Sequence, residues 1–305
     1  MSNVNQAAKE FRALKGKPVV RTVLEKDTET AQYVVWDPET KDGLIIDSVL
    51  NFDPVAGKAS HKSAQELLDV VRSEGINVVK IIETHAHADH LTAAQYLKQQ
   101  LGGSVPVCIG EGIKHVQEVF APMFQMEGVV STEDFDHLFT DGESYTLGNI
   151  ECEVFASPGH TPACMVHRIG DAIFTGDTIF MPDVGSARCD FPKGSAEMLY
   201  GSIQKIFSLP PHTRVFVGHD YPPEGRKHTF ETTVSAQTTA NKHINASTPL
   251  DDFVSWRRGR DDTLKPPRLI LPSLQVNIRA GRLPMEGGKV MLRIPVTVDD
   301  HAANL

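Results

Sequence analysis

The chain has 305 residues, of which 40% are hydrophobic and 23% are charged. These proportions are typical of a globular protein, and the length suits one large domain or one domain with an appendage. The formal net charge of -9 argues against a nucleic-acid backbone as the main partner, although a local group of Arg and Lys can still bind a small anion. The sequence has no apolar run long enough to span a bilayer, about 18 residues, so we expect no membrane segment.

The cysteines and the first residues indicate where the protein works. The four cysteines (Cys108, Cys152, Cys164 and Cys189) are few for the length and show no CxxC spacing. We therefore expect no disulfide scaffold and a reducing, cytoplasmic setting. Residues 1–6 lack the apolar core of a signal peptide, which agrees with that prediction.

The apolar patterns predict both strands and helices along the chain. The first part is predicted to form a short helix, three strands, an amphipathic helix and a buried strand, over residues 5–15, 19–24, 32–36, 43–50, 63–74 and 77–82. The middle part is predicted to form helices from residue 91 and over 113–120, and strands over 105–110, 144–147, 150–155, 163–168 and 172–174. The last third is predicted to form helices over 195–208, 229–243 and 250–258, a strand over 213–217 and an edge strand over 290–294. This order suggests a sandwich of sheets with helices outside.

One short run carries the strongest chemical signal. In Glu83-Thr84-His85-Ala86-His87-Ala88-Asp89-His90, four groups able to bind a metal fall within six residues. The run lies between the buried strand and the helix that follows it. Residues two apart in extended backbone point the same way, so His85 and His87 can converge on one point. Because imidazole and carboxylate are the usual ligands of zinc and iron, we predict a metal site rather than a structural cluster.

Three later turns have a common design, in which an apolar strand ends and a glycine precedes a metal-binding residue. The pairs are Gly159-His160, Gly176-Asp177 and Gly218-His219. Glycine lets the backbone turn sharply and approach a neighbour closely, and a sheet fixes the groups at its strand ends. We expect these residues to join the first four in one site. The other histidines lack this context and are predicted to lie on the surface or in packing positions: His61, His115, His137, His167, His212, His228, His243 and His301.

The set His85-x-His87-x-Asp89-His90, together with the three glycine turns, resembles the metallo-β-lactamase superfamily. The resemblance covers roughly residues 18–225. It implies an α+β fold, a four-layer αββα sandwich with the metal at one edge between the sheets. It also implies a catalytic domain over residues 1–245, and we expect residues 246–305 to form a C-terminal extension packed on the same domain.

Two chemistries remain open at this point. Seven ligands can hold two zinc ions bridged by a hydroxide that attacks a carbonyl, with Asp177 between the metals, as in a glyoxalase II type hydrolase of a glutathione thioester or a lactone. Alternatively, His85, His160 and Asp177 supply the facial triad of a non-haem Fe(II) oxygenase, which leaves positions open for substrate and O₂. Spacing does not choose between them. A third, non-enzymatic reading is a metal-dependent sensor.

Two further segments favour the oxygenase. Residues 183–191 are similar to the Gly-x-x-Arg-x-Asp-Phe segment of the ETHE1-like persulfide dioxygenases, with Ser186 where that motif often has cysteine. Residues 271–284 resemble the tail of a longer bacterial branch of that family. The resemblance implies oxidation of glutathione persulfide by O₂ and water to sulfite and glutathione, at one Fe(II) per chain, in a protein that we expect to be a homodimer.

Individual roles follow from this resemblance. It implies that the iron ligands are His85, His160 and Asp177. It places Arg188 and Tyr221 near the glutathione. We expect the remaining members of the set, without a metal, to orient the ligands by hydrogen bonds; these are His87, Asp89, His90 and His219. Because guanidinium grips carboxylates, Arg226 and Lys227 are further candidates to bind the carboxylates of glutathione, and Cys189 is predicted to be a neighbour of the site.

Overall fold

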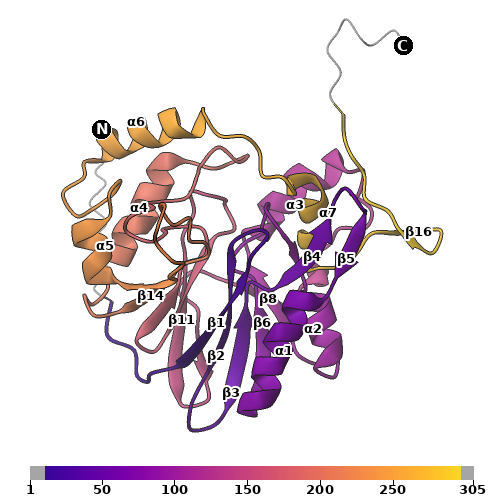
Figure 1. The fold of residues 1–305 in the computed structure, drawn as a ribbon, viewed down its shortest axis with the longest axis horizontal. Helices are drawn as coiled ribbons and strands as arrows, with labels where there is room; N and C mark the ends of the chain where they lie inside the picture. The colour runs from indigo at the N-terminus through magenta and orange to yellow at the C-terminus, as the bar shows by residue number, and fades with distance from the viewer. Residues whose placement is uncertain (1–10, 297–305) are drawn as a thin grey trace, which may run out of the picture.

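The computed structural model describes residues 11–296 and contains two six-stranded sheets that lie face to face (Figure 1). The first sheet has the order β1 (Val19–Glu25), β2 (Thr30–Trp36), β3 (Asp42–Ile46), β6 (Asn77–Ile82), β8 (Val107–Gly110) and β9 (His137–Phe139). The second has the order β10 (Ser144–Leu147), β11 (Ile150–Ala156), β12 (Met165–Ile169), β13 (Ala172–Phe174), β14 (Arg214–Phe216) and β15 (Glu231–Thr233).

Helices cover the outer face of each sheet. The first sheet packs against α1 (Lys62–Glu74), α2 (Ala94–Gln100), α3 (Ile113–Met123) and α7 (Ile270–Asn277), and a 3-10 helix, η1 (Thr132–Asp134), precedes β9. The second sheet packs against α4 (Ala196–Phe207), α5 (Val234–Ala240) and α6 (Leu250–Asp261). A separate apolar cluster fills the space between the sheets. The predicted α+β sandwich with four αββα layers is therefore confirmed.

The alternation of side chains along β2 shows how one strand serves two layers. Ala31, Tyr33 and Val35 point into the cluster between the sheets, whereas Val34 and Trp36 belong to the cluster beneath the helices. All five are almost fully buried. Successive side chains of a strand point to opposite faces, so a strand with helices on one side and a sheet on the other is apolar throughout.

The predicted single strand over residues 43–50 is wrong, because the chain turns at Asp47. This residue has a left-handed φ of 54°, which ends β3 and starts β4 (Val49–Asp53). Strand β4 leaves the main sheet and pairs with β5 (Lys58–Ser60) and β7 (Leu91–Thr92). The Asp47 carboxylate accepts a hydrogen bond from the backbone N–H of Thr84, 2.7 Å away, which holds the turn against the loop after β6.

The last third of the chain departs most from the sequence patterns. The predicted helix over 229–243 is instead β15 followed by α5, because Thr232 and Thr233 are β-branched and extend the sheet beside β14. The predicted edge strand over 290–294 is instead a short hairpin of β16 (Met285–Glu286) and β17 (Lys289–Val290). The unpredicted α7 contains Pro272 in its first turn, where a missing N–H costs no helical hydrogen bond.

Some smaller predictions are also settled. Residues 11–15 are not helical, and the rest of the predicted first helix, like His301, lies outside the described residues. All four cysteines are buried and free, and the free thiols agree with the prediction that there is no disulfide scaffold. Between residues 11 and 296 no helix is both long and apolar enough to cross a membrane.

The strand directions bring several loops to one end of the sandwich. Strands β3, β6 and β8 run parallel, so the turn at Asp47 and the run that starts at Glu83 leave the first sheet at the same edge. Strands β13 and β14 are also parallel, and the loops that carry Asp177 and His219 follow them. Parallel strands place their carboxyl ends together, where ligands bind in open α/β sheets.

Candidate metal centre

His85, His160 and Asp177 converge at this end of the sandwich. Their ligand atoms lie within 4.8 Å of one another. The Nε2 atoms of His85 and His160 lie 4.0 Å and 3.8 Å from Asp177 Oδ2. Both imidazoles and the carboxylate are buried, with at most 9% of each residue exposed. The structure therefore brings together the three residues that the sequence resemblance proposes as iron ligands.

Hydrogen bonds fix which nitrogen of each imidazole faces this point. His160 Nδ1 lies 2.8 Å from the carbonyl oxygen of Arg188, so it must carry the proton that it donates there. Thr84 donates a hydrogen bond from its hydroxyl to Asp47, 2.9 Å away, so its oxygen accepts a hydrogen bond from the protonated Nδ1 of His85 at 3.0 Å. In both rings Nε2 is left with a lone pair directed toward Asp177.

The three residues fit a divalent metal. His85 Nε2 and Asp177 Oδ1 are buried and have no hydrogen-bond partner within residues 11–296, which is costly unless a ligand satisfies them. Burial lowers the pKa of both His85 and His160, and strongly so for His85, so the imidazoles stay neutral and keep their lone pairs. Two neutral imidazoles and one carboxylate on one face are a ligand set for Fe(II), and three such residues also hold catalytic zinc.

Asp89, His90 and His219 lie on the other side of Asp177. His219 Nε2 is 3.4 Å from Asp89 Oδ2 and 3.6 Å from Asp177 Oδ1, while its Nδ1 donates to the carbonyl of Glu29. His90 Nδ1 is 3.1 Å from Asp89 Oδ2. Burial opposes ionisation of Asp89, but His90 and His219 hold the pKa of its carboxyl well below the usual value. Ligand atoms of His87, Asp89 and His90 also lie within 4.8 Å of one another and make a second group able to hold a metal.

His87 is turned away from the first group. Its Nε2 lies 3.0 Å from Asp47 Oδ1 and 3.2 Å from Glu83 Oε2, and all three residues are buried. Burial alone would lower the pKa of His87, but the charges of Asp47 and Glu83 raise it well above the usual value. Thr92 donates a hydrogen bond to the other oxygen of Glu83. One ring nitrogen of His87 is therefore committed to two carboxylates, although His85 two residues earlier faces Asp177.

Two of the predicted glycine turns show why no side chain fits there. A Cβ atom on Gly176, which has a φ of 46°, would lie 2.3 Å from Thr84 Oγ1. A Cβ atom on Gly218 would lie 2.6 Å from Asp177 Oδ1. Both distances are far below a normal contact, so the prediction that glycine permits close approach at these turns is confirmed.

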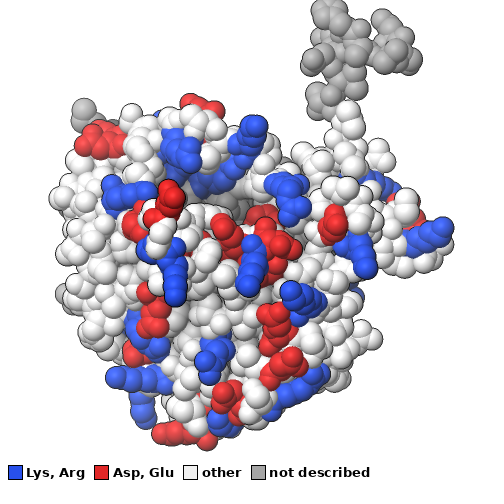
Figure 2. All heavy atoms as spheres, viewed as in Figure 1, with Lys and Arg blue, Asp and Glu red and all other residues white. Residues whose placement is uncertain are grey.

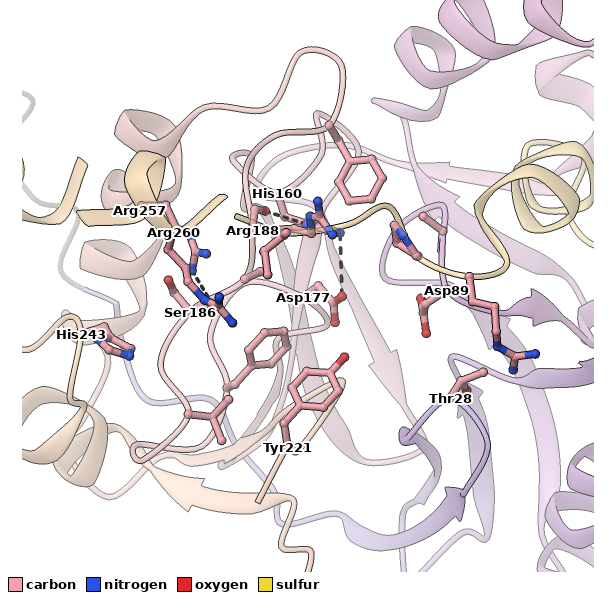
Figure 3. Close-up of a pocket in the computed structure, with 18 of the residues that line it drawn as sticks. Thr28, Asp89, His160, Asp177, Ser186, Arg188, Tyr221, His243, Arg257 and Arg260 are labelled. Carbon is pink, nitrogen blue, oxygen red and sulfur yellow. Dashed lines mark hydrogen bonds and ion pairs between the residues drawn. The ribbon is translucent and has the colours of Figure 1, made fainter. Parts of the chain in front are cut away.

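The centre opens into a cavity of about 630 Å³, a size typical of small-molecule sites. Phe180, Phe191 and Tyr221 provide aromatic surface in the same cavity as His160 and Asp177, and the Phe191 ring meets the His160 ring edge-on. Figure 3 shows the labelled residues around this space, with His160 and Asp177 in the middle. In Figure 2 the hollow is bordered by Lys and Arg side chains above and by acidic side chains below.

The residues proposed to bind glutathione differ in their placement. Arg188 and Tyr221 line the cavity. The Arg188 guanidinium pairs with Asp190 and donates to the carbonyl of Lys265, while its own carbonyl holds His160. Tyr221 stacks on the His219 ring at a centroid distance of 5.6 Å.

Arg226 and Lys227 do not line this cavity. Arg226 forms ion pairs with Asp183 and with Asp220, whose side chain is fully buried. Lys227 is exposed. Cys189 is likewise not part of the cavity lining, and its buried side chain packs under α4 and α6.

Comparisons with known proteins identify the family. Residues 27–219 match the protein family described as the metallo-beta-lactamase superfamily. The chain belongs to this superfamily. It is 45% identical over 288 residues to glyoxylase B2 of Dictyostelium discoideum, which covers 93% of this chain and 98% of that protein.

Two relatives carry another name. The chain is 32% identical over 210 residues to the mitochondrial persulfide dioxygenase ETHE1 of Bos taurus, covering 68% of this chain and 70% of that protein. The crystal structure of ETHE1 from Myxococcus xanthus superposes with a TM-score of 0.68 at 24% identity, covering 87% of this chain and all of that one. This last similarity establishes a shared metallo-beta-lactamase fold.

Sequence reasoning missed two buried carboxylates that hold histidines of the candidate centre. Asp47 and Glu83 hold His87, and Asp47 reaches His85 through Thr84. The signal was available in part, because Asp47 ends one apolar strand and Glu83 follows another. Had the two strands been known to lie side by side and parallel, these carboxylates would have been expected at one edge.

Sequence reasoning also missed one wall of the cavity. His243, which was predicted to be a surface or packing residue, lines the cavity and stacks on Trp256 at a centroid distance of 3.9 Å. Further residues from the same part of the chain line it as well: Lys242, Arg257, Arg260, Leu264, Pro267 and Arg268. No motif marks these positions, because their place depends on how α6 packs on α4.

Proposed function

We propose that this protein is a persulfide dioxygenase that oxidises glutathione persulfide with O₂ and water to sulfite and glutathione at one Fe(II). The observation that carries the proposal is the orientation of His87. With its Nε2 held by Asp47 and Glu83, the point shared by His85, His160 and Asp177 has two imidazoles and one carboxylate. That ligand set on one face is the facial triad of non-haem iron oxygenases.

The protein's own residues bind the metal ion, orient its ligands and shield the centre from water. His85, His160 and Asp177 would hold the ion, with the two imidazoles kept in the correct tautomer by Thr84 and by the Arg188 carbonyl. Phe180 and Phe191 exclude water from one side of the centre. When bound, Fe(II) would supply a redox-active centre that can bind a soft sulfur anion and O₂.

The overall reaction balances without a further oxidant. Glutathione persulfide, one O₂ and one water give glutathione, one sulfite and two protons. The terminal sulfur loses electrons to O₂, the sulfur–sulfur bond breaks, and glutathione leaves with a proton on its thiol. The relationship to the mitochondrial persulfide dioxygenase of Bos taurus supports this reaction.

A binuclear zinc hydrolase acting on a glutathione thioester is the second candidate. The higher identity to the protein named glyoxylase B2 favours it. So does the second group, formed by His87, Asp89 and His90, which offers ligand atoms for another ion. Both candidate reactions use a substrate attached to the sulfur of glutathione. They differ in the metal and in the bond that is cleaved.

Metal content and oxygen uptake distinguish the two. Protein purified without added metal is expected to contain about one iron per chain, since one triad is free to bind it. With glutathione persulfide it is expected to consume O₂ and to release sulfite in a one-to-one ratio. Two zinc ions per chain, no oxygen uptake after iron loading, and rapid cleavage of a glutathione thioester would establish the hydrolase instead.

A further inference from the structure

Three cations that line the cavity have no ion-pair partner anywhere in residues 11–296. They are Lys242, Arg260 and Arg268, and all three are solvent-exposed. Arg260 donates one hydrogen bond to the hydroxyl of Thr263. The chain as a whole carries a net charge of -9, so these unpaired cations run against the overall sign. Hydrogen bonds from the backbone N–H groups of Ala56 and Val55 lower the pKa of Asp53, and the charge of Arg268 adds to this effect without forming an ion pair. Cations gathered at a cavity and not held in an ion pair are available to bind an anionic ligand.

Other arginines at the same cavity are already engaged. Arg257 is buried and forms an ion pair with Asp261, one helical turn along α6. Arg188 pairs with Asp190. Among the cations that line the cavity, Lys242, Arg260 and Arg268 are therefore the ones whose charge is not already used in an ion pair.

Lys242 and Arg260 lie at one end of the cavity. His243 follows Lys242 in the chain and stacks on Trp256, which precedes Arg260 by one turn of α6. Burial, together with the positive charges of Lys242, Arg257 and Arg260, lowers the pKa of His243 to about 4, as expected if these cations are close to it. Apart from the engaged Arg257, this end offers two free cations, and none of the acidic residues that line the cavity belongs to it.

Arg268 lies at the opposite end. Arg268, Asp27 and Thr28 together line both the cavity and a small crevice that adjoins it. Figure 3 places His243 and Arg260 on one side of the metal ligands and Thr28 on the other. This second end therefore offers one cation and one carboxylate, with the metal centre between the two ends.

Glutathione has a matching distribution of charge. Its glycyl end carries only a carboxylate, its γ-glutamyl end carries a carboxylate and an ammonium group, and its sulfur lies between them. Resting on the proposed function, we infer that the cavity binds the glutathione moiety in one direction. The glycyl carboxylate binds Lys242 and Arg260, and the γ-glutamyl group binds Arg268 through its carboxylate and Asp27 through its ammonium. Because the cysteinyl residue is the middle one, its sulfur reaches the metal centre in either direction, and the charges at the two ends of the cavity set the direction.

The test combines variants with ligands that lack one end. Arg260→Gln and Arg268→Gln are compared with Arg258→Gln, a matched control on α6 whose side chain is 66% exposed and pairs with Glu197 away from the cavity. The ligands are reduced glutathione, γ-glutamylcysteine, which lacks the glycyl end, and cysteinylglycine, which lacks the γ-glutamyl end. Their dissociation constants are measured by calorimetry on the metal-containing protein, and KM and kcat are measured with the corresponding persulfides.

The expected pattern is a pairing of each variant with one ligand end. Arg260→Gln weakens the binding of glutathione roughly fivefold, the scale of one solvent-exposed charge pair, but leaves the affinity for γ-glutamylcysteine unchanged. Arg268→Gln weakens the binding of glutathione to a similar extent but leaves the affinity for cysteinylglycine unchanged. Both variants raise KM with kcat preserved, and Arg258→Gln matches the unaltered protein.

Two results overturn the inference. An exchanged pattern, in which Arg260→Gln leaves cysteinylglycine unchanged, reverses the direction of binding. If a variant loses the same affinity for all three ligands, or loses none, neither cation binds one particular end of glutathione. Calorimetry with reduced glutathione requires no turnover, so the inference and the proposed function fail separately. Absent oxygen uptake with the expected binding pattern rejects only the dioxygenase, whereas oxygen uptake without the pattern rejects only the direction.

Discussion

The polar groups around the metal centre and the unpaired cations of the cavity differ in whether the protein itself supplies their partners. His87 has Asp47 and Glu83, and Asp220 has Arg226. Arg260 and Arg268 form no ion pair in the described part of the chain, although the charge of Arg268 acts on the exposed Asp53. A side chain with fixed partners holds geometry, and its loss affects stability or metal binding. A side chain that lines the cavity and keeps its charge free is available to a ligand, and its loss affects affinity.

The largest effect is expected at the centre itself. His85→Ala removes one of the three proposed metal ligands. The loss of metal affinity is expected to exceed the roughly 10–100-fold that results from removing a residue that only supports a ligand. We expect bound iron to fall from about one per chain to near zero and oxygen uptake to fall by more than about 100-fold. Metal analysis and an oxygen electrode measure both.

His61→Ala is the control for this change. His61 lies on the surface, where its ring stacks on Tyr96, and it belongs to none of the metal-binding groups found within residues 11–296. It should leave metal content and activity unchanged. A His85→Ala protein that retained one iron per chain would show that this residue is not a ligand.

His87→Ala separates the two neighbouring histidines. The change leaves the buried carboxylates of Asp47 and Glu83 facing each other without a cation, which costs about 3–5 kcal/mol of unfolding free energy. Iron content should stay near one per chain, because His87 faces away from the triad. Urea unfolding and metal analysis on the same preparation provide the measurement.

The matched variant is His87→Gln, whose amide can still donate a hydrogen bond to a carboxylate and should lose less stability. The opposite outcome is equally clear. If His87→Ala keeps its stability but loses one of two bound metals, His87 is a ligand and the centre is binuclear.

The sequence predicted the layers of the fold but not their internal order. Apolar strands and amphipathic helices carry their own periodicity, so the sandwich was expected from residues such as those of β2 and α1. The order of strands in each sheet depends on contacts between distant segments, which periodicity does not report. Where a local pattern was ambiguous, as over residues 229–243, pairing of Thr232 and Thr233 with β14 decided the structure.

The site shows the same division. His160, Asp177 and His219 were predictable because each ends an apolar strand after a glycine. Asp47 was not, because its role requires β3 to lie parallel to β6. The unpaired cations were not either, since Lys242 and Arg268 are separated by 26 positions and meet the same cavity only through the packing of α6.

Arg226→Gln tests an arginine with fixed partners. The buried Asp220 would lose its ion pair, keeping the hydrogen bond from the backbone N–H of Thr229. We expect a loss of about 1–3 kcal/mol in unfolding free energy, with KM for glutathione persulfide unchanged. Thermal unfolding and steady-state kinetics report the two quantities. A stable variant with a raised KM would instead return Arg226 to the substrate-binding set.

The smallest effect is expected for Lys227→Ala, and it shows that a free charge alone does not bind substrate. Lys227 and Lys242 are both exposed, and neither forms an ion pair within residues 11–296. Only Lys242 lines the cavity. Lys227→Ala should change unfolding free energy by less than about 0.5 kcal/mol and leave KM within experimental error. Lys242→Ala, its matched partner, should raise KM while kcat is preserved. Equal kinetic effects of the two changes would mean that long-range attraction by net positive charge, rather than contact in the cavity, draws the anionic substrate to the protein.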